Sequence, residues 1–119
     1  MKQPISIVRG TTNFFHVYIQ DQNGEPYTLD DMDHLVFGIK ANPMDSERIF
    51  TKDISQAVGT TADGGAIYLL ELYPSETRYF DPGKYFYDIG LQVGTSQFYI
   101  VVETSVFEVK PNITELGGT

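Results

Sequence analysis

Apolar and polar residues alternate with a period of two along most of the chain. In residues 14–19, Phe15, Val17 and Ile19 take every second position, and residues 35–40 repeat this pattern. Side chains two residues apart project from the same face of a β-strand, whereas a helix repeats its apolar positions every three or four residues. The alternation therefore predicts a chain made largely of half-buried strands.

Further segments share the strand pattern, and together they give the set 5–8, 14–19, 35–40, 48–54, 66–72, 84–93 and 98–109. We expect a bulge or turn near residues 103–105, inside the last segment. Clusters of Gly, Pro, Asn, Asp and Ser separate the segments, at residues 21–26, 42–43, 63–65, 81–83 and 94–96. Short strands with turns between them favour an all-β, antiparallel β-sandwich of seven to eight strands over alternating strands and helices.

One or two short helical turns are expected, and the candidate segments are residues 28–33 and 74–79. The second begins with Pro74, which suits the first position of a helix because the N–H that proline lacks has no intrahelical partner there. With 119 residues, of which 41% are hydrophobic, the chain has the size and composition of one folded domain. We place this domain at residues 1–111 and a C-terminal tail at residues 112–119.

The turn Asp81-Pro82-Gly83 opens directly into a segment with tyrosine at positions 85 and 87. A buried phenol needs a hydrogen-bond partner for its hydroxyl, and a loop carbonyl can supply one. The spacing resembles the tyrosine corner of immunoglobulin-like β-sandwiches, in which a Tyr at the start of a strand bonds back to the preceding loop. This resemblance implies an immunoglobulin-like sandwich with a structural corner formed by Asp81, Gly83 and Tyr85.

The chain is acidic, with 8 Lys and Arg residues against 16 Asp and Glu residues and a net charge of −8. Phosphate backbones and anionic lipid headgroups would repel such a protein, so we expect neither nucleic-acid binding nor membrane binding. Cysteine is absent, which excludes disulfides, thiolate nucleophiles and cysteine-based zinc sites. The first ten residues, MKQPISIVRG, lack the apolar run of a secretory signal, so we expect a soluble domain made in the cytoplasm.

The densest group of ionisable residues is Asp30-Asp31-Met32-Asp33-His34. Carboxylates beside a histidine could ligate a divalent metal or act as a base near neutral pH. Consecutive residues project in different directions, however, so we interpret the group as a solvated turn before the strand at Leu35. The segment Asp21-x-Asn23-Gly24-x-Pro26 shares the start of a calcium loop but lacks its downstream Glu, which favours a hairpin turn.

Other candidate catalytic residues are isolated from one another. His16 lies in the middle of a predicted strand, on the face opposite Phe15 and Val17, so we expect it to be partly exposed. Glu71 and Asp88 would act as a glycosidase pair only if one cleft held both carboxylates about 5–9 Å apart, and nothing in the sequence brings them together. We therefore predict no enzyme activity, no metal site and no cofactor.

Aromatic residues are unusually frequent, at 13% of the chain. Tyr18, Tyr68, Phe86 and Tyr99 alternate with positions that we expect to be buried, which would place them on the outer face of a sheet. Exposed aromatic side chains mark protein–protein interfaces or sugar-stacking platforms. The alternative is that other segments, such as 28–33 and 74–79, cover these faces.

The order of turns and hydrophobic spacings over residues 9–114 is more informative than any one of them. The series consists of Arg9-Gly10-Thr11, Asp21-x-x-Gly24-x-Pro26, Phe37-x-Ile39-Lys40, Asp63-Gly64-Gly65, Leu72-x-Pro74-x-x-Thr77, Pro82-Gly83-x-Tyr85-x-Tyr87 and Phe107-x-Val109-x-Pro111. It resembles the small immunoglobulin-like β-sandwich proteins of tailed phages and prophages, similar to the N-terminal domain of the phage baseplate upper protein. The resemblance implies a non-catalytic virion structural protein in the tail or baseplate, located in the virion or the host cytoplasm.

An open sandwich has edge strands whose free backbone groups must be guarded or paired. Lys52 and Asp53 are candidate guards of the segment 48–54. The segment 98–102, FYIVV, has no charge, so it should be central in a sheet or covered by a partner. We therefore expect a homo-oligomer or a hetero-complex with other phage structural subunits. A carbohydrate-binding module that uses exposed aromatic residues is the alternative function.

Overall fold

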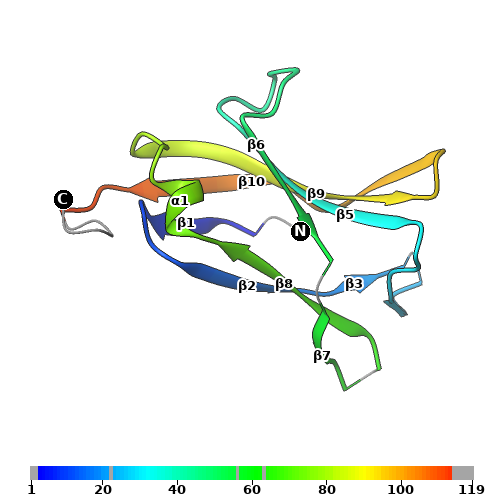
Figure 1. Ribbon diagram of the computed structural model, residues 1–119. Helices are drawn as coiled ribbons and strands as arrows, with labels where there is room; N and C mark the ends of the chain where they lie inside the picture. The colour runs from blue at the N-terminus through cyan, green and yellow to red at the C-terminus, as the bar shows by residue number, and fades with distance from the viewer. Residues whose placement is uncertain (1–2, 22, 56, 63, 114–119) are drawn as a thin grey trace.

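The computed structural model describes residues 3–21, 23–55, 57–62 and 64–113 (Figure 1). Its elements, in chain order, are β1 (Ile5–Val8), β2 (Asn13–Val17), β3 (Ile19–Gln20), β4 (Pro26–Tyr27), β5 (Asp33–Lys40), β6 (Phe50–Ile54), β7 (Ala57–Thr60), β8 (Ala66–Leu72), α1 (Pro74–Thr77), β9 (Gly83–Val93) and β10 (Gln97–Lys110). The fold is therefore all-β with one short helix. Among the described residues, no helix has the length and apolar composition needed to cross a membrane.

The strands form one large sheet, one smaller sheet and a small hairpin. The five-stranded sheet has the order β1-β10-β9-β5-β6, the three-stranded sheet has the order β2-β8-β7, and β3 pairs with β4. All pairs are antiparallel except β1 with β10, which is parallel. The prediction of a purely antiparallel arrangement was thus wrong for β1. This strand pairs with the far end of the chain, so no tight hairpin constrains its direction.

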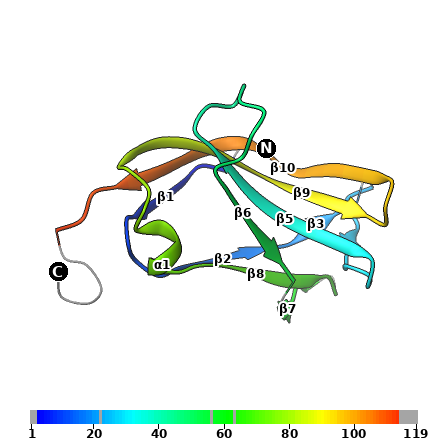
Figure 2. The ribbon, with the colours of Figure 1, turned by 45° about the horizontal axis from the view of Figure 1, so that its top comes forward.

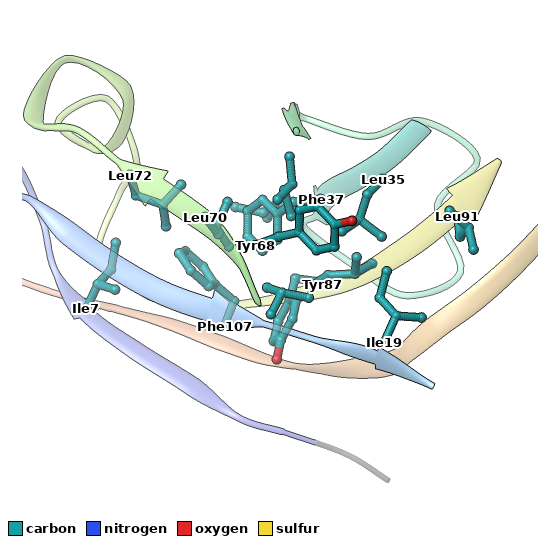
Figure 3. Close-up of a cluster of buried hydrophobic side chains, with 14 of the residues drawn as sticks. Ile7, Ile19, Leu35, Phe37, Tyr68, Leu70, Leu72, Tyr87, Leu91 and Phe107 are labelled. Carbon is teal, nitrogen blue, oxygen red and sulfur yellow. The ribbon is translucent and has the colours of Figure 1, made fainter. Parts of the chain in front are cut away.

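The hydrophobic core lies between the five-stranded sheet and the layer formed by β2, β3 and β8 (Figure 2). Every second residue of β8, from Ala66 to Leu72, points into this space, as do Leu35, Phe37 and Ile39 of β5. The buried hydrophobic residues are Ile7, Val17, Ile19, Leu35, Phe37, Ile39, Ile54, Ala66, Tyr68, Leu70, Leu72, Tyr87, Ile89, Leu91, Phe107 and Val109, most of which Figure 3 labels. Burial of apolar side chains between two layers is the main favourable contribution to folding.

The predicted strands are confirmed with small shifts of their ends. Segments 5–8 and 66–72 match β1 and β8, and the expected irregularity in the last strand appears as register shifts between Ile100 and Val102 and between Val102 and Ser105. The segment 14–19 is divided into β2 and β3, and the short strands β4 and β7 were not predicted. The helical turn expected at residues 28–33 is wrong, because Asp33 already belongs to β5 and only Asp31 and Met32 form a turn.

The predicted helical turn after Pro74 is confirmed as α1. Proline stands at the start of the helix, and the Glu76 carboxylate accepts a hydrogen bond from the Tyr73 backbone N–H at 2.9 Å. The hydroxyl oxygen of Thr77, which is buried, accepts a hydrogen bond from the Gly10 N–H at 3.1 Å. The helix therefore ties the turn after β1 to the turn after β8.

The predicted domain and tail meet near Asn112. Its side-chain oxygen accepts a hydrogen bond from the Arg9 Nε–H at 3.0 Å, so this residue lies against the end of β1. Residues 114–119 of the predicted tail lie outside the described residues.

Candidate interaction surfaces

The outer face of the three-stranded sheet carries an apolar and partly charged surface. Because the even residues of β2 and the odd residues of β8 point away from the core, Phe14 lies across from Glu71 and His16 lies across from Leu69. With Val58 and Tyr73, these side chains line a shallow hollow, which we call the β2–β8 face. Phe14 is 58% exposed, so a large aromatic ring on this face is open to solvent.

A lysine holds Tyr73 at the rim of this face. The Lys52 Nζ donates to the Glu76 carboxylate at 2.7 Å and lies 4.6 Å from the centre of the Tyr73 ring. It also donates to the backbone carbonyl of Glu71. Lys52 therefore bridges β6 to β8 and α1. β6 lies at the edge of the five-stranded sheet, and the role of Lys52 as a guard of this edge stays a prediction. Asp53 is exposed.

The outer face of the five-stranded sheet carries a second apolar surface, formed by Phe86, Ile100 and Val106, which we call the β9–β10 face. These side chains line a hollow together with Pro43 and Thr104. Val106 lies directly across from Phe86 in the register of β10 and β9, so the two side chains share one face of the sheet. This surface lies on the opposite side of the molecule from the β2–β8 face.

The ring of Phe98 covers the middle of β9 next to this surface. A Cβ atom at Gly90 would lie only 2.4 Å from the Phe98 ring, so the ring packs directly on the glycine backbone. A glycine in the interior of a strand often marks such a close approach. Phe98 is nevertheless 52% exposed, because nothing described covers its other side.

Only one half of β10 has a neighbouring strand on both sides. β1 pairs with Phe107 to Lys110, and β9 pairs with β10 along nearly its whole length. Within the described part of the chain, no strand pairs with the other side of the segment from Gln97 to Glu103, which we call the β10 edge. In Figure 1 the hairpin of β9 and β10 extends away from β1. The uncharged segment 98–102 was expected to be central or covered by a partner, and it is not central, because one of its sides faces no described strand. Cover by a partner stays a prediction.

The predicted corner residues are brought together by the turn before β9. The Tyr85 hydroxyl donates to the Asp81 carbonyl oxygen at 2.7 Å, and Gly83 has a φ of 150° at the start of the strand. The rings of Phe80 and Tyr85 meet edge to face, 5.2 Å apart, and burial raises the pKa of Tyr85. Tyr87, one position deeper, is buried, and its hydroxyl donates to the Gln3 carbonyl.

The four aromatic residues predicted to form an interface do not share one surface. Tyr18 is 64% exposed after β2 and Tyr99 is exposed at the β10 edge, whereas Phe86 is half-buried on the β9–β10 face. The prediction that Tyr68 is exposed was wrong. Tyr68 is 3% exposed because its side chain lies on the same, core-facing side of β8 as that of Leu70. Its hydroxyl oxygen accepts a hydrogen bond from the Leu29 N–H at 2.8 Å.

Sequence reasoning overlooked the most exposed apolar positions. Phe14 and His16 both occupy even-numbered positions of β2, which face solvent. The position of Phe14 in this alternation could have identified it as an exposed residue. The sequence analysis identified Phe98 and Ile100 only as members of the uncharged segment 98–102 and did not predict that they are exposed. Tyr73 carries no such signal, because its position depends on how α1 packs against β6.

The acidic group before β5 has a structural role. The Asp33 carboxylate accepts hydrogen bonds from the Asp30 N–H at 3.0 Å and from the Tyr27 hydroxyl at 2.7 Å. Both bonds lower the pKa of Asp33, and the bond from the Asp30 backbone has the larger effect. The bond between Tyr27 and Asp33 also raises the pKa of Tyr27 to about 12. The described residues contain no group of three or more His, Asp or Glu side chains that could hold a metal ion.

Two further candidate sites are resolved by the strand register. The Asp21 carboxylate accepts hydrogen bonds from the backbone N–H groups of Asn23 and Glu25, which confirms the hairpin turn, here between β3 and β4. Glu71 points out from the three-stranded sheet, and Asp88 points out from the five-stranded sheet. The two carboxylates therefore lie on opposite outer faces of the molecule and share no cleft.

No protein-family model matches the chain, and no curated protein matches its sequence. The β2–β8 face, the β9–β10 face and the β10 edge are therefore the features on which a functional conclusion rests.

Proposed function

We propose that the protein is a non-catalytic structural module of a tailed-phage or prophage particle, where it assembles with other tail or baseplate subunits. The observation that carries this proposal is the exposure of apolar side chains on both outer faces of the molecule, with Phe14 on one side and Ile100 on the other. A module that contacts neighbours on two sides can link them within a larger particle. The protein would then be found in the virion or, before assembly, in the host cytoplasm.

We also propose that the fold is an immunoglobulin-like β-sandwich. Two sheets packed over one core and the hydrogen bond from Tyr85 to Asp81 at the start of β9 support this assignment. The parallel pairing of β1 with β10 departs from a purely antiparallel sandwich. The fold supports many functions, so the assembly role is argued from the surfaces and not from the fold.

The surfaces have the chemistry of protein interfaces. Interface cores are enriched in aromatic residues and depleted of charge, while their rims are polar. The β2–β8 face places Phe14 and Leu69 beside His16 and Glu71, which matches that arrangement. The net charge of −8 of the whole chain would favour solubility of the unassembled subunit.

The proposal is tested by capture of the products of neighbouring genes with the purified protein. We expect Phe14→Asp to weaken capture at least tenfold, because it places a charge in the centre of the β2–β8 face. Ile49→Asp is the matched control, because Ile49 is similarly exposed, at 51%, but lies in the loop between β5 and β6. Failure of the wild-type protein to bind any of these products, together with its absence from induced particles by mass spectrometry, would refute the assembly role.

A carbohydrate-binding module is the second candidate function. Phe14 and Tyr73 flank Glu71 and His16 in the hollow of the β2–β8 face, and an aromatic ring beside hydrogen-bonding groups can hold a sugar ring. A glycan array tests this candidate with Phe14→Ala as the variant. Sugar binding that disappears in Phe14→Ala and persists in Ile49→Ala would favour this function over assembly.

A further inference from the structure

Glu71 places a carboxylate among the apolar side chains of the β2–β8 face. It lies directly across from Phe14 in the pairing of β2 with β8, and Leu69 precedes it on the same side of β8. Tyr73 continues this side beyond the end of the strand, because its backbone is still extended, with a φ of −99° and a ψ of 158°. These four side chains line one hollow, so the carboxylate is set among aromatic and aliphatic groups.

The Glu71 carboxylate has no partner within the part of the chain that the structure describes. Lys52 donates to the backbone carbonyl of Glu71 and not to its side chain, and the charge of Lys52 is paired with the Glu76 carboxylate at 2.7 Å. Neither a hydrogen bond nor an ion pair reaches the Glu71 carboxylate from a described residue, although the residue is half-buried. A charge that is partly removed from water gains from a cation or hydrogen-bond donor placed against it.

The two aromatic rings beside this carboxylate are also suited to a cation. Tyr73 already attracts one, because the Lys52 Nζ lies 4.6 Å from the centre of its ring. Phe14 is 58% exposed and Tyr73 is 40% exposed, so both rings have surface left for another group. The attraction between a cation and the face of an aromatic ring grows when water is excluded. The hollow therefore combines a carboxylate with two rings, which is the chemistry of a cation site.

We propose that the hollow of the β2–β8 face receives an arginine side chain of a partner subunit. The guanidinium group donates to the Glu71 carboxylate and stacks on the Phe14 ring. Arginine suits this site better than lysine, because a planar guanidinium can bond to a carboxylate through two N–H groups and stack on a ring at the same time. Leu69 and Val58 offer apolar contacts to the methylene groups of the arginine. The inference rests on the proposed function, because it names the group by which a neighbouring subunit is recognised.

The charge of the whole chain favours the same kind of partner. With a net charge of −8, the protein attracts a basic surface and repels an acidic one, including a second copy of itself. His16 also lines the hollow, and it opposes a bound cation when it is protonated. At about pH 8 an ordinary histidine is neutral, so Glu71 then sets the sign of the charge in the hollow. Binding is therefore to be measured at that pH.

A short peptide tests the site without the partner subunit. The probe is an arginine residue between two glycines, with both ends blocked, and its control is the peptide with citrulline, which has nearly the same shape but no charge. NMR titration should show saturable shifts of the Glu71 carboxyl carbon and the Phe14 ring protons, with an affinity in about the millimolar range. The citrulline peptide should bind about tenfold more weakly, because the charge-assisted hydrogen bonds are lost.

Matched variants assign the binding to the Glu71 charge. Glu71→Gln keeps the size of the side chain and should weaken binding of the arginine peptide about tenfold. Asp88→Asn removes the same charge from a half-buried position on the opposite outer face, and it should bind the peptide as the wild type does. Glu71→Asp keeps the charge and should retain most of the binding. This retention shows that a substitution at this position leaves the face intact.

Four results would overturn the proposal. The first is the absence of a saturable shift at Glu71, and the second is equal binding of the citrulline peptide. The third is a Glu71→Gln protein that binds as the wild type does, or a shift of the same size at Asp88, since the peptide would then follow the net charge alone. The fourth is a glycan that binds at Phe14 where the arginine peptide does not, which would favour the carbohydrate-binding function.

The capture experiment separates this proposal from the assembly role. Glu71→Gln should weaken capture of the products of neighbouring genes about tenfold, and Asp88→Asn should not. Capture that is lost in Phe14→Ala but unchanged in Glu71→Gln would refute the arginine contact and leave the assembly role in place. Peptide binding at Glu71 by a protein that captures none of those products would support the cation site and count against the assembly role.

Discussion

The two ends of the molecule differ in how completely β10 is enclosed. At the end that contains α1, β10 has β9 on one side and β1 on the other, and Phe107 is fully buried. At the end that contains the β3–β4 hairpin, β9 is the only described strand that pairs with β10, and Ile100 is about half exposed. The same strand therefore serves the core at one end and the surface at the other.

Side-chain hydrogen bonds sharpen this contrast. At the α1 end, Thr77 and Asn112 each join two distant segments of the chain, whereas the bond from Tyr85 to Asp81 is local. At the β3–β4 end, the Tyr68 hydroxyl provides a link of this kind to the Leu29 N–H, and the bond from Tyr27 to Asp33 is local. We infer that the α1 end holds the fold together and that the β3–β4 end is free to be used for contacts.

The largest effect is expected from truncating β10 at its enclosed end. Phe107 packs against the rings of Phe37, Phe80 and Tyr87, so Phe107→Ala should lower the free energy of unfolding by roughly 3–5 kcal/mol. Ile100→Ala, in the open half of the same strand, should cost less than about 1 kcal/mol, because its side chain is already half in water. Urea unfolding of both variants in dilute monomer measures the difference. Equal losses would contradict the contrast between the two ends.

A smaller effect is expected from removing one buried hydroxyl at the α1 end. Thr77→Val keeps the shape of the side chain but leaves the Gly10 N–H without its acceptor. An unsatisfied buried donor costs about 1–3 kcal/mol. Thermal unfolding checks the value, and Thr77→Ser, which keeps the hydroxyl, is the control. A Thr77→Val protein as stable as wild type would show that water replaces the bond and that this end is less closed than we infer.

Much of the enclosed end could be predicted from the sequence, because it depends on local pattern. Alternation identified the strands that carry Ile39 and Leu72, and the turn at residues 81–83 pointed to the partner of Tyr85. These features need only neighbours in the chain. A period of two and a Pro-Gly turn are enough to specify them.

The candidate surfaces depend on pairing between distant segments, which alternation does not specify. The sequence does not show that the pairing of β1 with β10 begins at Phe107 and leaves Ile100 without a strand on that side. This follows from the register between residues that lie about a hundred positions apart in the chain. Tyr68 was misplaced for a related reason. Its segment has apolar residues at both odd-numbered and even-numbered positions, so the pattern alone did not decide which face of the strand is buried.

A still smaller effect is expected from the corner at the start of β9. Tyr85→Phe removes the bond to the Asp81 carbonyl, which should cost about 0.5–1.5 kcal/mol. The loss should be smaller than that of Thr77→Val, because Asp81 is exposed and its carbonyl can bond to water. Urea unfolding measures both variants under the same conditions. A larger loss for Tyr85→Phe would place the corner, and not the α1 contact, at the centre of this end.

The smallest effect is expected from acid, and it should act on the turn around Asp33 and not on the corner at the start of β9. The folded state lowers the pKa of Asp33, chiefly through the Asp30 N–H and then through the Tyr27 hydroxyl. The ionised carboxylate therefore stabilises the fold above its ordinary pKa of 3.8. This contribution is lost as the pH falls through the lower folded-state value. At the α1 end, Tyr85 donates to a backbone carbonyl, which does not titrate.

The variant Asp33→Asn tests whether the Asp33 carboxylate makes stability depend on acid pH. Between about pH 5 and pH 2, the urea midpoint of the wild type should fall by more than that of Asp33→Asn, which has no carboxylate to protonate at this position. Carbon NMR of the Asp33 carboxyl group should show its titration below 3.8. Hydrogen exchange in acid should quicken at residues 27–33 before it does at residues 81–87. Simultaneous loss of protection at both ends would mean that they open as one unit, and the division between a closed end and a contact end would then fail.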